Sequence, residues 1–445
     1  MIPNHENRAR IPTNACCRPI LSSSPSRTIY GKTWAVRLAI GIALLAQGTS
    51  AHATWSFVIA DTETKELAVA TVTCVENLDL LAVSPVVIVG KGAATCQAFA
   101  DFDGIRRPIM RQGIQQMDDP GNILVELAQI TGHQQRQYGF VDTLGRSATF
   151  TGSLVFTQLP YAEGKTGSSG NLVYAIQGNV ITGNCVVRDI ENAIIDTTGD
   201  LPAKVIAGVE AARNAGGDGR CSCSPAGPSG CGCPPTSFTK TGHIGGIILS
   251  RPGDTDDAVC NVNGCADGDY FLRLNVAGQD SGDPPPTDQL IGLFDTWRAG
   301  LIGRIDAVAS EISFSPPTIP ADGQATSIMR IEPRDWQGGP VTQPVVNISI
   351  EHASGSAGSS DIGAVTAEPD GSYTAPITAG TESGTDVFRI VVDDGIRPVT
   401  IAPDPRIEVN DTGAVPSASV WGLCGLLLSI LCAGHLVFRR TSRLA

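Results

Sequence analysis

Thr54 is the residue of this sequence whose type and position could do chemistry most directly. Cleavage after Ala53, at the A-x-A site formed by residues 51–53, would make Thr54 the first residue of the mature chain. An N-terminal threonine carries a hydroxyl nucleophile and, on the same residue, an α-amino group whose pKa near neutrality lets it accept the hydroxyl proton. The position therefore predicts attack on an amide carbonyl without a histidine partner.

A second cleavage position competes with this one. A cut after Ala51 would leave His52 as the first residue and place Thr54 inside an ordinary β-strand. We favour the cut after Ala53, because A-x-A is the better recognition site.

Two further positions could support a threonine nucleophile. Gly178 and Asn179 follow Gln177, and an asparagine amide beside a glycine N–H could donate two hydrogen bonds to an oxyanion. A glycine turn with a capping asparagine is the alternative interpretation. Asp61 could orient the amine, or it could simply begin the turn before Thr62.

The sequence favours disulfides over metal sites and predicts no cofactor. Nine cysteines fall between the two ends of the chain, and the loop RCSCSPAGPSGCGCPP holds four of them in C-x-C pairs rather than the C-x-x-C spacing of common zinc sites. Cys260 and Cys265 bracket a second loop and could pair with each other, which leaves one thiol of the nine free or bridging molecules. The aspartate-rich loop over residues 254–269 could hold Ca²⁺, but its spacing is not that of an EF-hand, and acidic surface loops are common.

Charge and the two ends of the chain indicate an exported protein. The formal net charge is −13 over 445 residues, which argues against nucleic acid as a partner. Arginines and the apolar run Leu38–Ala46 precede the A-x-A site, as in a signal peptide. The apolar run Val420–Phe438 ends in arginines and is long enough to span a membrane, so we expect the C-terminal segment to anchor the chain to the cell envelope. The preceding PSASVWG resembles the entry of PEP-CTERM and IPTL-type sorting tails.

The elements that must position Thr54 follow from hydrophobic periodicity. TWSFVIADTETKELAVATVT and YGFVDTLGRSATFTG each predict a β-hairpin. Helical patterns occupy residues 105–117, 122–130, 186–195, 202–214 and 289–300. From residue 310 to 409 short Val/Ile/Thr runs alternate with Gly, Pro, Ser and Asp turns, which is typical of a small β-sandwich. The chain is thus predicted to be α+β first and all-β second.

Several strings resemble, in order, the family catalogued as domain of unknown function 1028, which is placed in the N-terminal-nucleophile (Ntn) hydrolase superfamily. They are TWSFVIADTETKELAVA, YGFVDTLGRSATFTG, YAIQGNV and VIAGVEAARNAGGDGR. The resemblance begins at Thr54 and implies a four-layer αββα sandwich. SFSPPTIPADGQATSIMRI and its continuation resemble the immunoglobulin-like repeats of invasin and intimin surface proteins.

These observations give two hypotheses. The first is an exported amidohydrolase or peptidase at the cell surface, using Thr54, Gly178, Asn179 and Asp61 on an amide or peptide-like substrate. The second is a non-catalytic surface adhesion protein that keeps the same fold. We expect a signal peptide over 1–53, an Ntn-hydrolase-like domain over 54–305, an immunoglobulin-like domain over 306–410 and a C-terminal segment over 411–445.

Overall fold

The structure is a computed structural model that describes residues 54–158 and 161–411. The predicted signal peptide and the apolar run Val420–Phe438 lie outside these residues. None of the helices that the structure describes is long and apolar enough to cross a membrane.

Six strands form the sheet that begins with Thr54, and they lie in the order β10-β9-β2-β1-β8-β7. The first predicted hairpin is confirmed, because β1 and β2 pair antiparallel from Thr54 opposite Thr73 to Ala60 opposite Leu67. Alternate side chains of β1 point to opposite faces, and both faces are apolar because both are buried. The bounds are β1 (Thr54–Asp61), β2 (Leu67–Thr73), β7 (Glu163–Ser169), β8 (Leu172–Asn179), β9 (Ile244–Ser250) and β10 (Leu272–Val276).

A second sheet has four strands in the order β3-β4-β5-β6. Its β5–β6 hairpin is the second one that the sequence predicts. The β3–β4 hairpin was not predicted, because β4 reads GAATCQA and lacks the large β-branched residues that mark a strand. The bounds are β3 (Pro85–Ile88), β4 (Gly92–Ala98), β5 (Arg136–Asp142) and β6 (Ser147–Thr151).

Helices begin where the sequence places caps. The Asp119 side chain accepts a hydrogen bond from Gly121 N at the start of α3, and Asp200 accepts one from Ala203 N at the start of α6. Pro286 occupies the first turn of α8, where a missing N–H is harmless. All five predicted helices are present. The bounds are α2 (Arg106–Gln116), α3 (Pro120–Leu127), η1 (His133–Gln135), α4 (Ser153–Gln158), α5 (Cys185–Asp196), α6 (Leu201–Asn214), α7 (Gly219–Ser222) and α8 (Pro286–Ala299).

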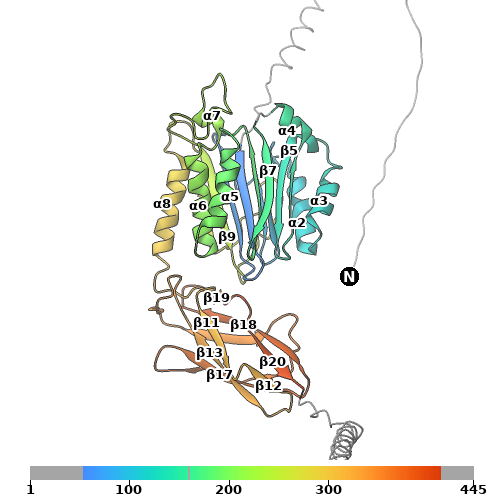
Figure 1. Ribbon diagram of the computed structural model, residues 1–445, viewed down its shortest axis with the longest axis vertical. Helices are drawn as coiled ribbons and strands as arrows, with labels where there is room; N and C mark the ends of the chain where they lie inside the picture. Colours follow the sequence, from blue (N-terminus) through green and yellow to red (C-terminus); the bar gives the residue numbers. More distant parts are fainter. Residues whose placement is uncertain (1–53, 159–160, 412–445) are drawn as a thin grey trace, which may run out of the picture. The chain divides into compact units, whose positions relative to one another are not determined.

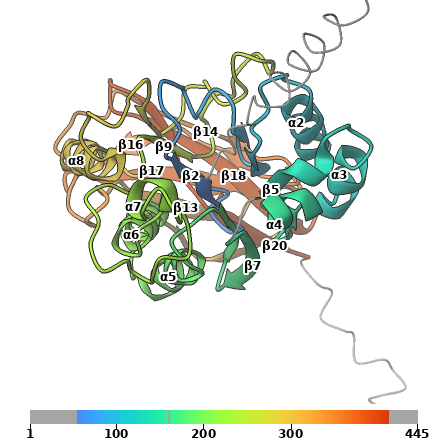
Figure 2. The ribbon, with the colours of Figure 1, turned by 90° about the horizontal axis from the view of Figure 1, so that it is seen from above.

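The two sheets face each other, and helices cover their outer sides (Figures 1 and 2). Trp55, Phe57 and Ile59 of β1 pack with side chains of α5, α6 and α8 in one core. Val58 and Ala60 point the other way into a core between the sheets. A third core joins the second sheet to α2 and α3. Thr54 therefore begins a central strand that is buried on both faces.

Residues 306–411 form an all-β unit, as the sequence predicts. Two sheets, β11-β13-β17-β15 and β12-β20-β18-β14, share one core that includes Met329, Phe388 and Ile390. Strands such as β13 alternate buried and exposed residues, the pattern of a sheet with one wet face. The bounds are β11 (Glu311–Ser315), β12 (Thr318–Pro320), β13 (Thr326–Glu332), β14 (Asn347–His352), β15 (Asp361–Ile362), β16 (Thr366–Ala367), β17 (Tyr373–Thr378), β18 (Gly384–Asp393), β19 (Pro398–Thr400) and β20 (Arg406–Asn410).

Candidate active site

Thr54 lies at the start of β1, between the ends of β2 and β8. Its cross-strand neighbours are Thr73 and Asn179. The Thr54 side chain is buried, and its Oγ1 donates a hydrogen bond to Thr73 Oγ1 at 3.3 Å. The hydroxyl that the sequence singles out is thus held in a defined position on a rigid strand.

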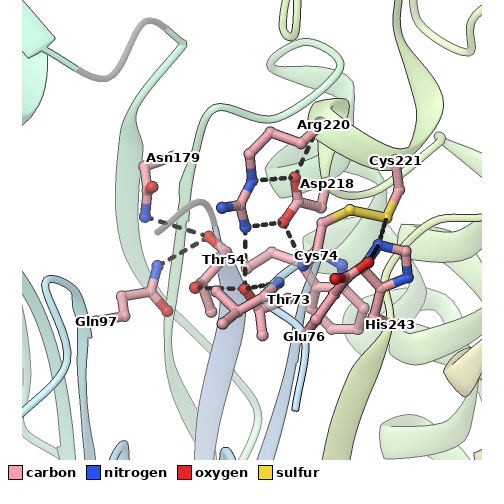
Figure 3. Close-up of polar contacts among 12 residues, drawn as sticks. Thr54, Thr73, Cys74, Glu76, Gln97, Asn179, Asp218, Arg220, Cys221 and His243 are labelled. Atoms are coloured by element: carbon pink, nitrogen blue, oxygen red, sulfur yellow. Dashed lines mark hydrogen bonds and ion pairs between the residues drawn. A yellow bond between two sulfur atoms is a disulfide. The ribbon is translucent and has the colours of Figure 1, made fainter. Parts of the chain in front are cut away.

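The carbonyl oxygen of Thr54 accepts hydrogen bonds from two side-chain amides. Gln97 Nε2 lies 3.2 Å and Asn179 Nδ2 3.4 Å from it, and both amides also donate to Gln137 Oε1, at 3.0 and 2.9 Å (Figure 3 shows the first two). All three amide side chains are buried. Buried amides keep their orientation only when they are hydrogen-bonded, so this group fixes the backbone around Thr54.

The side chains of Gln177 and Asn179, which flank Gly178 in the segment predicted to bind an oxyanion, point to different places in the structure. Asn179 reaches Thr54, but Gln177 points between the sheets, where its Oε1 accepts from Ser56 Oγ and Thr95 Oγ1. Gly178 lies within the ladder opposite Trp55, and its carbonyl oxygen accepts from Gln137 Nε2. Asn179 is therefore the member of this segment whose side chain contacts Thr54.

Asp61 lies at the opposite end of β1 from Thr54. Its Oδ1 accepts hydrogen bonds from Glu63 N at 2.8 Å and Thr64 N at 2.9 Å. This is the turn-initiating arrangement given above as the alternative, and the whole length of the strand separates the carboxylate from the Thr54 amine.

Asp218 and Arg220 approach the site from the loop around α7. Arg220 Nη2 lies 3.2 Å from Thr73 Oγ1 and 2.9 Å from Asp218 Oδ2. Asp218 is fully buried, accepts Cys74 N at 2.6 Å and caps α7 through Arg220 N. A guanidinium thus lies one hydroxyl away from Thr54 Oγ1, with its charge balanced by a buried carboxylate (Figure 3).

Three disulfides join the loop around α7 to its neighbours, and a fourth closes a separate loop. Cys74, directly after β2, pairs with Cys221, and Cys185 of α5 pairs with Cys233, while Cys223 pairs with Cys231. The C-x-C loop is thus joined to the end of β2 and to α5. The predicted Cys260–Cys265 pair is confirmed. Cys96 is the free thiol of the nine, and burial raises its pKa to about 12.

Three aspartates of the 254–269 loop bind backbone N–H groups, while Asp267 and Asp269 pair with arginines. Asp254 Oδ2 accepts from Phe271 N at 2.7 Å, and Asp256 Oδ1 accepts from Val89 N at 2.8 Å. Both carboxylate oxygens of Asp257 accept hydrogen bonds from N–H groups of the same loop, those of Val259 and Asp267. Their carboxylates hold the loop in shape.

The candidate site contains four residues that the sequence did not single out as neighbours of Thr54: Thr73, Gln97, Gln137 and Arg220. Thr73 was within reach, because a hairpin that pairs Ala60 with Leu67 must also pair Thr54 with Thr73. Gln97 and Gln137 come from the other sheet, and no local pattern places them opposite β1.

Comparison with known proteins gives two family matches. Residues 54–226 match the model of the family of unknown function DUF1028. Residues 306–411 match the model of invasin domain 3. The DUF1028 match thus begins at Thr54 and includes Asn179, Asp218 and Arg220.

Solved structures resemble both parts. A crystal structure of a Silicibacter pomeroyi protein, described as DUF1028, is 17% identical, with a TM-score of 0.38, and covers 56% of this chain and 88% of that one. InvD of Yersinia pseudotuberculosis is 26% identical (TM-score 0.18, 23% of this chain), and the adhesin InvE of the same organism is 30% identical (TM-score 0.17, 22% of this chain). The chain spans about a quarter of the length of each, 27% in both cases. Among curated proteins no match was found. The disulfides and the invasin-type domain are consistent with an extracellular surface protein.

Proposed function

We propose that the DUF1028 domain is an N-terminal-nucleophile hydrolase that acts on amide bonds of a peptide-like substrate, with Thr54 exposed by cleavage after Ala53. The observation that carries this proposal is the hydrogen-bonded group around Thr54: its hydroxyl bonds to Thr73, which also accepts from Arg220. Two facing sheets with helices outside, and a family match that begins at Thr54, support the assignment to the Ntn superfamily.

The proposed reaction uses the two groups of one residue. The α-amino group of Thr54 accepts the hydroxyl proton, and Oγ1 attacks the amide carbonyl. The positive charge of Arg220, next to Thr73 Oγ1, stabilises negative charge at Thr54 Oγ1. Asn179, whose side-chain amide reaches the Thr54 carbonyl from the neighbouring strand, donates to the oxyanion. The proton passes to the leaving amine, and water then hydrolyses the acyl-enzyme.

The experiment has two parts. N-terminal sequencing of the exported protein should give Thr54 as the first residue; any other first residue contradicts the mechanism. An electrophilic acyl probe should then label the wild type and Thr54→Ser but not Thr54→Ala. Thr54→Ser is the matched control, because it keeps the hydroxyl and loses only a methyl group.

The second candidate is adhesion, and the invasin domain 3 match favours it. In this case residues 306–411 present the first domain at the cell surface, with the C-terminal segment as anchor. Equal labelling of the wild type and Thr54→Ala, with Thr54 as the first residue, would favour this function over catalysis.

A further inference from the structure

A cluster of metal-binding side chains lies beside the Thr54 site and takes no part in the proposed reaction. Cys74, Cys221 and His243 offer ligand atoms that all lie within 4.8 Å of one another. They come from the end of β2, from α7 and from the residue before β9. Within residues 54–158 and 161–411 it is the one such grouping of three His, Cys, Asp or Glu side chains.

Glu76 adds a fourth possible ligand. His243 Nε2 lies 3.4 Å from Cys221 Sγ and 3.5 Å from Glu76 Oε1 (Figure 3). Tetrahedral zinc with thiolate bonds of about 2.3 Å and imidazole bonds of about 2.0 Å places its ligand atoms roughly 3.5 Å apart. The Cys221–His243 distance is therefore that of two ligands that share one ion. Glu76 lies outside the group of three and approaches it from the side of His243.

The oxidised state leaves His243 poorly satisfied. Its side chain is buried, and its Nδ1 has no hydrogen-bond partner. Nε2 has only a disulfide sulfur, which is a weak acceptor, and a carboxylate oxygen at a distance beyond a good hydrogen bond. An ion bound at Nε2 would replace these two weak contacts of Nε2 with a metal–ligand bond.

We propose that Cys74, Cys221, His243 and Glu76 bind Zn²⁺ when the Cys74–Cys221 disulfide is reduced. A dithiol supplies the two electrons and two protons that convert the disulfide to two thiols and is itself oxidised to a disulfide. Each thiol then releases its proton as its sulfur binds zinc. Two thiolates, an imidazole and a carboxylate form a donor set that suits zinc.

The ion would replace one cross-link with another between the same elements. Asp218 Oδ2 accepts the N–H of Cys74, and Asp218 holds Arg220 against Thr73. The disulfide keeps β2 and the α7 loop together in the oxidised protein, and zinc would do so in the reduced protein. This inference does not depend on whether Thr54 is catalytic.

The test uses the full chain with Cys223→Ser and Cys231→Ser, which removes the two nearest competing thiols of the loop. The protein is reduced without oxygen, freed of reductant and titrated with Zn²⁺ against a chromophoric chelator. We expect one equivalent to bind tightly to the reduced protein and none to the oxidised protein. His243→Ala should weaken binding at least tenfold, whereas His352→Ala, a histidine of the β-sandwich, should leave it unchanged.

A second measurement covers loss of folding on reduction. Thermal unfolding of the reduced protein should occur at a higher temperature with one equivalent of zinc than without, and His243→Ala should abolish this gain while the oxidised variant remains folded. Absence of zinc binding, equal affinity in His243→Ala, or a reduced protein that zinc does not stabilise would overturn the proposal.

Discussion

At the scale of single residues, the arrangement around Thr54 separates two kinds of polar contact. One kind holds the main chain: Gln97 and Asn179 bind the Thr54 carbonyl. The other holds the Thr54 hydroxyl, through Thr73 and Arg220. Substitutions of the second kind should change reactivity more than stability.

Thr73→Val tests this distinction. The variant keeps the shape of the side chain but removes the hydroxyl that links Thr54 to Arg220. We expect acyl-probe labelling of Thr54 to slow about tenfold, equivalent to about 1.4 kcal/mol, and the free energy of unfolding to fall by about 1 kcal/mol. The control is Thr71→Val, on the same strand as Thr73. It removes a buried hydrogen bond to the carbonyl of Trp55 in β1 and should leave the labelling rate unchanged.

Cys96 should be inert in the folded protein. Burial, and secondarily the charge of Asp101, raise the pKa of this thiol to about 12, so only about one thiol in 10⁴ is ionised at pH 8. Alkylation followed by mass spectrometry of the peptide that contains Cys96 should show no added group in the folded, oxidised chain at pH 8 and one added group after unfolding in denaturant. A folded chain that is alkylated at Cys96 within minutes would contradict this assignment.

At the scale of elements, the sequence predicts the parts whose pattern is local. The hairpin turns and the five long helices follow from alternation, periodicity and caps such as Asp119. β4 escapes prediction because its small residues fit against the facing sheet without a hydrophobic signature of their own. The same limit applies to the candidate site: the predicted cleavage position singles out Thr54 in the sequence, whereas Gln137 is placed by the packing of one sheet on another.

Strand β7 lies at the edge of the six-stranded sheet and carries a carboxylate with a perturbed pKa. Burial raises the pKa of Glu163, Lys165 lowers it, and Glu191 raises it further; Oε2 has no hydrogen-bond partner. A pKa raised by folding means that the charged form is disfavoured in the folded state. The resulting loss of stability is absent below the unfolded value of about 4.5 and grows as the pH rises above it.

Glu163→Gln should therefore stabilise the protein at neutral pH. We expect a higher melting temperature than wild type at pH 7 and no gain at pH 4, with a difference of about 0.5 kcal/mol in the free energy of unfolding. Glu126→Gln, at an exposed position of α3, serves as the control. A gain that is the same at both pH values would show that charge is not the cause.

At the scale of the whole molecule, the disulfides close loops of very different length. The Cys185–Cys233 bond closes a separation of 48 residues, and Cys260–Cys265 closes one of 5. Chain entropy therefore assigns the first bond the larger effect on stability.

Replacing both cysteines of a disulfide by serine measures how much that disulfide contributes to the free energy of unfolding. We expect the free energy of unfolding to fall by about 4 kcal/mol for Cys185→Ser with Cys233→Ser, and by about 2 kcal/mol for Cys260→Ser with Cys265→Ser. Urea unfolding of the full chain gives both values. A larger loss from the short loop would mean that native contacts, rather than loop closure, dominate.

The Cys74–Cys221 bond also sets when the candidate site can be complete during synthesis and export. It spans 147 residues, so it can close only after most of the first domain has been synthesised and exported. At roughly 5–20 residues per second, Asp218 and Arg220 follow Thr54 by roughly 10–30 s. During this interval a newly exposed amino-terminal threonine lacks the guanidinium beside Thr73. Under the proposed function, Thr54 is exported before Arg220, so the nucleophile stays inactive until the chain has passed the translocation machinery.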